Sequence, residues 1–411
     1  MSIVSASDRG ELSPASRIWT IAICFLIILL DGLDTTAIGF VAPALSGEWG
    51  LDRSAITPAF VATNAGALIG YLICGPIAQR CGYRLVGTAS VFLFAGGTLL
   101  SALAYDIPSL TILRFVSAIG LGGALPIAIT AATQVAQPKK RPAVAMLVAT
   151  GISVGAVIGG VTAVPLIQAM GWRSVFVIGG IAPLLLLPFF AKVLPSKPIG
   201  SHSETSTNSP IKELFADGLA PATLLLWLYV FLIGLVTYSL QLWTPTLLID
   251  FGFSAAQAPL GAAAVGMGGL IGNLLTLAIM SKIGPRTVLI FASVPGILCL
   301  IALGQLDVAQ GLVLPLIAGV GAGVIVGYAG STALGVALYP GEARSTGVGW
   351  ASAMGRFGSI VGPALGGVQL ALGWPAKDII MTLVIPAGVS FLALVAMGLV
   401  RKRPESNEAT T

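Results

Sequence analysis

Long apolar runs separated by short polar segments fill this chain from about residue 18 to about residue 400. Twelve of them approach or exceed the ~20 residues that a helix needs to cross a bilayer. They cover roughly 18–42, 56–78, 85–105, 109–134, 142–168, 174–193, 222–247, 256–280, 287–304, 309–335, 346–370 and 379–400. Because lipid offers no hydrogen-bond partner to an open sheet edge, such runs predict helices. The pattern predicts an all-α membrane protein with twelve transmembrane helices.

The longest polar stretch between these runs, residues 192–218, divides the predicted helices into two groups of six. When the first group is shifted by 202 residues, residues 43–51 align with 245–253, and residues 79–84 align with 281–286. A duplicated six-helix unit is typical of secondary transporters, whose substrate site lies near the bilayer midplane between the repeats. We therefore expect a tail at 1–17, a first half at 18–193, a linker at 194–221, a second half at 222–400 and a tail at 401–411.

The distribution of charge predicts the orientation. Only 9% of the residues are charged, compared with about 25% in a soluble domain. Sixteen of the 21 Lys and Arg residues fall on the side of the membrane where both tails lie. The positive-inside rule then predicts cytoplasmic termini and a multi-pass protein of the cell inner membrane. The net charge of +5 follows from this topology, so it does not indicate nucleic-acid binding.

The sequence contains few residues in patterns that enzyme chemistry requires. The four cysteines are scattered, and the single histidine, His202, lies in a polar stretch, so neither a metal site nor a disulfide framework is predicted. There is no phosphate-binding GxxxxGK[ST] loop. We expect a protein that is not an enzyme and has no cofactor, in which an ion gradient drives any transport.

Two acids interrupt the first apolar run, in the segment "IILLDGLDTTAIGF". Asp31 and Asp34 are spaced i, i+3, which places them on one helix face. Two carboxylates this close are difficult to ionise together in a medium of low dielectric constant, and acids within membranes usually have a function. At the shift of 202 residues they align with Ile233 and Val236, whereas the Gly and Leu between them persist. We predict that both acids take part in proton coupling; the alternative is an acid pair that only fixes helix packing.

Arg114 and Arg356 are the only basic residues deep within the predicted helices. A guanidinium group in a cavity can bind a carboxylate through two parallel hydrogen bonds. We predict that Arg356 contacts an anionic substrate. For Arg114 two alternatives stay open, namely substrate contact and coupling to the aspartates.

The seventh apolar run carries several aromatic residues and one glutamine. Tyr238 and Gln241 lie on one helix face, where they could bind a flat ring and its polar substituent. Tyr328 is a weaker candidate of the same kind, and Trp227 is expected to be an interfacial anchor. The alternative for this aromatic stripe is contact with lipid or with the protein core.

Two segments, residues 151–160 and 358–367, share the spacing GxxxGxxxGG. Small residues at intervals of four allow close helix contacts, and proline permits a bend. We therefore predict helix-packing or gating roles for Gly155, Gly159, Gly362, Pro363 and Gly366.

Several motifs resemble a known family. The segments "GPIAQRCGYR" and "RFVSAIGLGG" resemble the major facilitator superfamily, and "DGLDTTAIGFVAPAL" resembles its aromatic acid:proton symporters. The resemblance implies the twelve-helix major facilitator fold with two pseudo-symmetric halves. It also implies import of a small aromatic or related carboxylate together with protons by alternating access. We expect a monomer in the lipid bilayer. The family's paired aspartates correspond to Asp31 and Asp34, and its two membrane arginines to Arg114 and Arg356.

The loop after the second predicted helix departs from the family pattern. The gating residues implied there are Gln79, Arg80, Gly82 and Arg84, but the family usually has an acid where Gln79 stands. Ser281 replaces the matching acid in the second half. Without these charges, the cytoplasmic contacts that hold the outward-open state are expected to be weaker.

Two other functions are compatible with a helical membrane protein. One is a proton-coupled exporter of drugs or other organic ions, although two arginines within the membrane do not favour cationic cargo. The other is a membrane sensor, although the tails and linker are too short to hold a folded signalling domain.

Overall fold

The computed structural model describes residues 14–137, 140–195, 214–216, 218–339 and 343–400, and all regular structure in these ranges is helical. In the first half the elements are α1 (Pro14–Trp49), η1 (Arg53–Ile56), α2 (Thr57–Cys81), α3 (Tyr83–Ser101), α4 (Ile107–Val135), α5 (Arg141–Met170) and α6 (Arg173–Val193). In the second half they are α7 (Ala220–Leu247), η4 (Leu248–Phe251), α8 (Pro259–Ile283), α9 (Pro285–Gln305), α10 (Gln310–Val320), η5 (Gly321–Ile325), α11 (Val326–Leu338), α12 (Ala343–Ala371) and α13 (Ala376–Val400). The segment η5 is a π-helical turn that joins α10 and α11 without a break.

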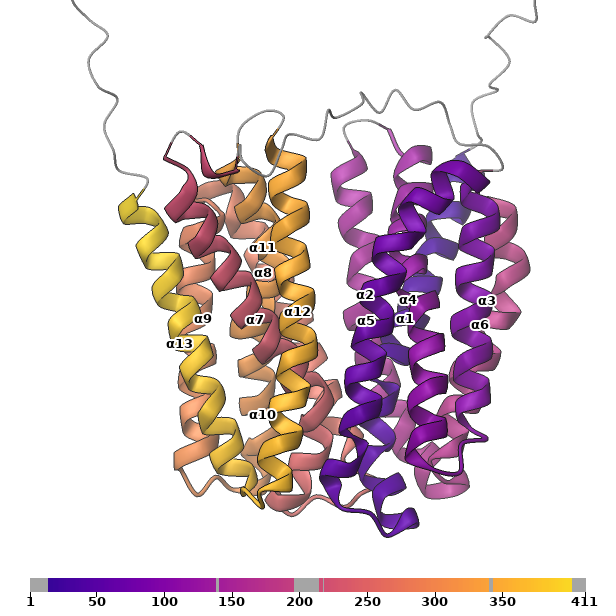
Figure 1. Cartoon of the computed structure of the whole chain (residues 1–411), viewed down its shortest axis with the longest axis vertical. Helices are drawn as coiled ribbons and strands as arrows, with labels where there is room; N and C mark the ends of the chain where they lie inside the picture. The colour runs from indigo at the N-terminus through magenta and orange to yellow at the C-terminus, as the bar shows by residue number, and fades with distance from the viewer. Residues whose placement is uncertain (1–13, 138–139, 196–213, 217, 340–342, 401–411) are drawn as a thin grey trace, which may run out of the picture.

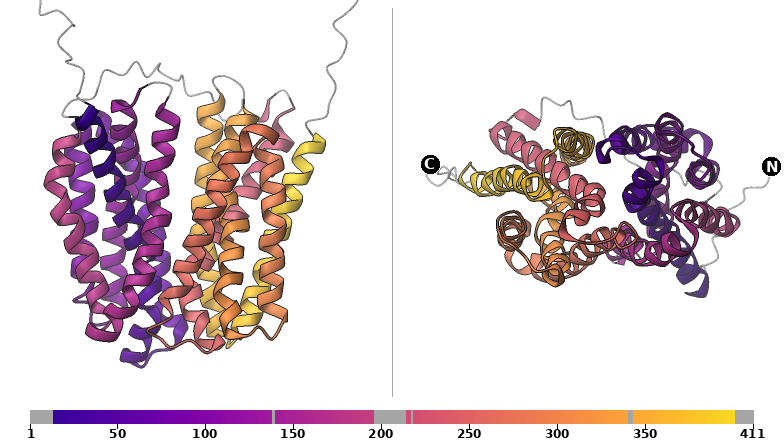
Figure 2. Two further views of the ribbon diagram at one scale, coloured as in Figure 1. Left: turned by 180° about the vertical axis from the view of Figure 1, so that it is seen from behind. Right: turned by 90° about the horizontal axis from the view of Figure 1, so that it is seen from below.

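The helices form two bundles that stand side by side (Figure 1). The α1–α6 bundle is drawn in indigo to magenta, and the α7–α13 bundle in rose to yellow (Figure 2). We call the end of the molecule where α1 begins and α13 ends the near end, and the opposite end, where α1 finishes at Trp49, the far end.

Among the described residues, eleven helical segments are long and apolar enough to cross a membrane. The 29-residue α12 is not among them, because Arg356, Gln369 and repeated glycines lower its hydropathy. The prediction of a helical, multi-pass membrane protein is therefore confirmed. The count of twelve transmembrane helices stays a prediction.

Glycines bring helices of the same half into backbone contact. A methyl group on Gly155 of α5 would overlap the carbonyl oxygen of Leu29 in α1. In the second half, a methyl group on Gly362 of α12 would overlap the carbonyl oxygen of Leu235 in α7. The two GxxxG segments thus pack α5 on α1 and α12 on α7, which are equivalent positions in the two halves.

The double glycine that ends each segment divides its contacts between the halves. Gly159 faces Leu33 and Phe40 of its own half, whereas Gly160 faces Ala263 of α8 in the other half. In the same way Gly366 faces Trp243 of its own half, and Gly367 faces Thr57 of α2 in the other half.

Pro363 lies between Gly362 and Gly366 on α12. Its carbonyl oxygen accepts a hydrogen bond from Trp243 Nε1 at 2.9 Å. Pro363 therefore contributes to the packing of α12 on α7, inside the second half.

The contacts between the halves include several near the far end. Arg53 forms an ion pair with Asp250 of the other half. Deeper in the protein, the rings of Phe60 and Trp243 meet edge to face with centroids 4.7 Å apart. Together with the double glycines, these contacts close the far end.

At the near end, one of the predicted gating residues of the α2–α3 loop, Arg84, contacts its own half. Gly82 has φ of +94°, a conformation that side chains rarely adopt, and connects α2 to α3. Arg84 Nε donates to the carbonyl oxygen of Ala191 at 2.5 Å, near the end of α6. Arg80 is exposed. The side chains of Gln79 and Ser281 lie outside the described part of the structure, so the prediction for the loop acids is not tested.

We expect Gly155→Ala to destabilise the protein by about 1–3 kcal/mol, because the added methyl group must push α5 away from α1. Gly75→Ala is a matched control, since a methyl group on Gly75 would meet no atom within 4 Å. Thermal unfolding of the two detergent-purified variants measures the difference. Equal melting temperatures would contradict the close packing of α1 and α5.

Candidate functional site

A cavity of about 390 Å³ lies between the two halves. Its size falls within the range of small-molecule sites, about 300–1,000 Å³. It is lined by α1, α2, α4 and α5 of the first half and by α7, α8, η5, α11 and α12 of the second. Met146 and Met280 line it within a few residues of the near ends of α5 and α8, so the cavity extends toward the near end.

Arg356 occupies one side of this cavity, surrounded by tyrosines. Its Nη1 donates a hydrogen bond to the hydroxyl oxygen of Tyr238 at 3.0 Å. Its guanidinium carbon lies 4.1 Å from the ring centroid of Tyr71, which belongs to α2 of the other half. The ring of Tyr328 meets that of Tyr238 edge to face at 5.8 Å. The cluster therefore joins both halves around a single positive charge.

Asp31 is the acid that lines the cavity. Its side chain accepts a hydrogen bond from Thr35 Oγ1 at 3.2 Å, and the residue is only 5% exposed. In the described ranges, no basic side chain forms an ion pair with it. Asp31 and Arg356 thus offer opposite charges to one space without neutralising each other by direct contact.

Asp34 lies behind the cavity wall, in a fully buried ion pair with Arg114 of α4. Arg114 Nη1 lies 3.0 Å from Asp34 Oδ1, and Nη2 lies 3.1 Å from Oδ2. Nη2 also donates to the backbone oxygen of Asp34 at 3.1 Å, and Thr98 Oγ1 of α3 donates to Oδ1 at 2.5 Å. Of the two alternatives for Arg114, the structure has the arginine coupled to an aspartate, and Arg114 does not line the cavity.

The spacing of the two acids explains their different surroundings. Residues three apart on an α-helix differ in direction by about 60°. Asp31 and Asp34 therefore share one broad side of α1, but one lines the cavity and the other points between α3 and α4. Gly32 between them fits against the backbone of Ile152 in α5, which explains why this glycine persists in the repeat.

The aromatic candidates of α7 separate into two groups. Tyr238 and Gln241 line the cavity, as Tyr328 does. Trp227 lies outside it and stacks on Trp350 of α12, with ring centroids 5.6 Å apart.

Sequence reasoning missed several residues of the cavity, which are Tyr71, Thr63, Asn64, Asn273 and Thr276. Their common signal is a polar or aromatic side chain within an apolar run of α2 or α8. That signal is too frequent to select them without the fold.

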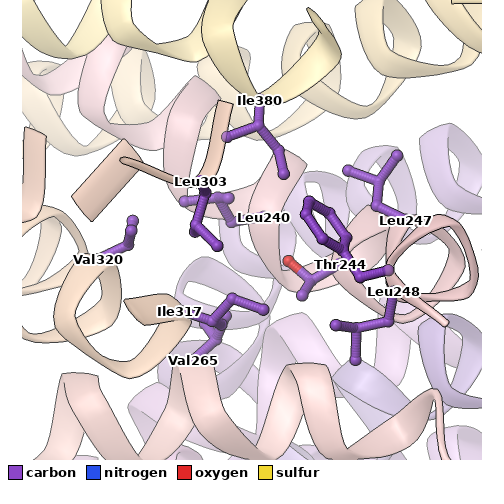
Figure 3. Close-up of a pocket in the computed structure, with 10 residues that line it drawn as sticks. Leu240, Thr244, Leu247, Leu248, Val265, Leu303, Ile317, Val320 and Ile380 are labelled. Carbon is purple, nitrogen blue, oxygen red and sulfur yellow. The ribbon is translucent and has the colours of Figure 1, made fainter. Parts of the chain in front are cut away.

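A second cavity, inside the second half, has a different character (Figure 3). Its volume is about 10 Å³, and its lining is apolar except for the hydroxyl of Thr244. A single water molecule needs about 10–15 Å³. This space is a packing void among side chains such as Leu303 and Ile380, and it offers no room for a substrate.

Comparison with known proteins places this site in context. The Major Facilitator Superfamily profile matches residues 24–337. The chain is 33% identical to the 4-hydroxybenzoate transporter PcaK of Pseudomonas aeruginosa, over 96% of this chain and 95% of that protein. It is 36% identical to the 3-(3-hydroxy-phenyl)propionate transporter of Escherichia coli, over 89% and 91%. It is 34% identical to the gallate transporter of Pseudomonas putida, over 94% and 93%.

Solved structures agree on the fold. A bacterial homolog of the human lysosomal transporter Spinster superimposes with a TM-score of 0.74 at 19% identity, covering 96% of this chain and all of that one. The nucleoside transporter NupG superimposes with a TM-score of 0.75 at 15% identity, covering 94% of this chain and all of that one. The two-bundle architecture, the match over residues 24–337 and relatives of nearly equal length lead to one conclusion. The chain belongs to the major facilitator superfamily, a family of membrane transporters.

Proposed function

We propose that this protein imports a small aromatic carboxylate in symport with protons, by alternating access across the inner membrane. The observation that carries the proposal is that Arg356 and Asp31 line the same cavity between the halves. The related transporters of 4-hydroxybenzoate, 3-(3-hydroxy-phenyl)propionate and gallate support the substrate class. In this proposal the transporter is a monomer with no cofactor, and both termini lie in the cytoplasm.

Arg356 is the proposed ligand of the substrate carboxylate. Among the described residues, Tyr238 is the one hydrogen-bond partner of its guanidinium group, which leaves further N–H groups for an anion. Tyr71 and Tyr328 add aromatic surface beside it, and aromatic rings prefer edge-to-face or offset contacts with one another. A flat aromatic acid satisfies both features, because its carboxylate meets the guanidinium while its ring packs on tyrosine.

Asp31 is the proposed proton carrier. An ionised Asp31 and a substrate carboxylate would place two negative charges in the cavity that contains Arg356. Protonation of Asp31 removes their mutual repulsion, so proton binding and substrate binding favour each other. This reciprocity is what a symporter requires, since neither solute should cross alone.

Asp34 and Arg114 are proposed to couple this event to helix movement. Their ion pair connects α1, which carries Asp31, to α4. A shift of α1 on protonation of Asp31 must therefore move or break a buried contact between two helices. Asp34 retains a role in proton coupling, exerted through Arg114.

In the proposed alternating access, the contacts between the halves at the far end must open and close during the cycle. With cytoplasmic termini, the cavity extends toward the cytoplasm, which corresponds to an inward-facing state. The outward-facing state then requires separation of Arg53 from Asp250 and of Phe60 from Trp243.

The proposal is tested by uptake of labelled aromatic acids into expressing cells, with and without a protonophore. We expect protonophore-sensitive accumulation of at least one acid, such as 4-hydroxybenzoate. Asp31→Asn should abolish accumulation above the external concentration but preserve exchange of external for internal substrate, because binding no longer depends on a proton. Asp307→Asn, at an exposed carboxylate outside the cavity, should accumulate substrate as the wild type does.

Two results would count against the proposal. Full concentrative uptake by Asp31→Asn would remove Asp31 from proton coupling. Absence of uptake, together with extrusion of organic cations by expressing cells, would support the exporter instead.

We expect Arg356→Lys to raise the KM for the transported acid about tenfold, because lysine keeps the charge but cannot bind a carboxylate through two parallel N–H groups. Arg173→Lys is a matched control, since Arg173 is exposed and pairs with Glu48 at the far end. Initial uptake rates over a range of substrate concentrations measure the effect. An unchanged KM in Arg356→Lys would exclude two-point binding of the carboxylate.

We expect Asp34→Asn to lower the free energy of unfolding by about 3–5 kcal/mol, because it leaves the buried Arg114 without a counter-charge. The double variant Asp34→Asn/Arg114→Gln should recover much of this loss, since both charges are then absent. Thermal unfolding in detergent compares the two. A double variant less stable than the single one would contradict a simple charge pair.

A further inference from the structure

The cavity is chemically divided between its two sides. Its charged groups, Asp31 and Arg356, are carried by α1 and α12, and the ring of Tyr71 of α2 lies against Arg356. Where α5 meets α8, the lining groups are uncharged hydroxyls and an amide: Thr150, Ser153, Asn273 and Thr276. Farther toward the far end, the contact of Gly160 with Ala263 holds α5 and α8 together.

Asn273 differs from the other polar groups of the cavity. It lies within the apolar run of α8, is half-buried, and forms no hydrogen bond with any residue that the structure describes. Asn64 on α2, by contrast, donates to the carbonyl oxygen of Phe60 at 3.0 Å, and Thr150 donates to that of Leu147 at 2.6 Å. A membrane-embedded amide without a protein partner is costly unless the contents of the cavity supply one.

The chemistry of an amide fits a phenolic hydroxyl. The asparagine side chain has an acceptor oxygen and two N–H donors, so it can bind a hydroxyl group that donates or accepts. Thr276 follows Asn273 by three residues, which places a second hydrogen-bonding group on the same side of α8. A carboxylate could accept hydrogen bonds here too, but among the described residues only Arg356, at the other side of the cavity, offers it a positive charge.

We propose that Asn273 is a specificity-determining residue that binds the ring hydroxyl of the substrate. This inference rests on the proposed function, in which Arg356 holds the carboxylate at the other side of the cavity. An aromatic acid then bridges the two halves of the protein, with its hydroxyl on α8. Hydroxylated aromatic acids are selected over unsubstituted ones, because an unsubstituted ring leaves Asn273 without a partner.

The test is equilibrium binding of benzoate and 4-hydroxybenzoate to the full-length protein, measured by titration calorimetry in detergent. The wild type should bind 4-hydroxybenzoate about tenfold more tightly than benzoate, the value of one hydrogen bond. Asn273→Leu, which keeps the size of the side chain, should reduce this preference to about twofold or less. Its affinity for benzoate should stay within about twofold of the wild type.

Gln369→Leu is the matched control, because it removes an amide of α12 that lies outside the cavity and donates to Thr382 Oγ1 at 2.9 Å. It should keep the preference for the hydroxylated acid. If Asn273→Leu does not yield folded protein, judged by its melting temperature, Asn273→Ala replaces it in the same titration.

Three other results of these titrations would overturn the assignment of Asn273, the inference as a whole, or the proposed function. A preference that survives in Asn273→Leu, or that disappears equally in Gln369→Leu, overturns the assignment of Asn273. Equal binding of both acids by the wild type overturns the inference but leaves the proposed function standing. Failure of the wild type to bind any aromatic acid overturns the proposed function, and the inference with it.

Discussion

A charge buried away from water needs a partner, and in the ion pair of Asp34 with Arg114 each residue supplies the other's counter-charge. Both side chains are inaccessible to solvent, and the aspartate also accepts a hydrogen bond from Thr98. The pair joins α1, α3 and α4 at one point, so the position of Asp31 one turn away depends on it. The ion pair of Asp34 with Arg114 thus fixes part of the scaffold around which the cavity, Asp31 and Arg356 are arranged.

The two halves share a backbone plan but differ in what they bury. Gly32 and Gly234 occupy equivalent positions in the repeat, and both bring α1 or α7 close to a neighbouring helix. Where the first half places Asp34 and Thr98, the second half has Val236 and Leu300, both fully buried. The second half thus forms equivalent helix packing with apolar residues at the positions where the first half has polar ones.

Much of this architecture could be predicted from the sequence, because bilayer thickness and backbone hydrogen bonding leave few alternatives for a long apolar run. The rarity of polar groups in such runs also singled out Asp31, Arg356 and Tyr238, which the structure places around one cavity. For Arg114 the sequence left two alternatives, because its partner depends on how α4 is rotated relative to α1. Neither the π-helical turn η5 nor the contact of Tyr71 with Arg356 could be predicted from the spacing of residues in the sequence, because both arise from packing between distant segments.

The double glycines affect how easily one half can rotate against the other. Gly160 and Gly367 have no side chains of their own, so Ala263 and Thr57 of the opposite half pack directly on helix backbone at these points. Interdigitated side chains would make any rotation of one bundle against the other proceed in discrete steps, each with its own barrier. In the proposed alternating-access cycle, glycine contacts of this kind would leave the rate of conformational change to the few polar and aromatic contacts at the far end. A handful of residues would then set the speed of that cycle, whereas the many others inside each half stabilise the fold.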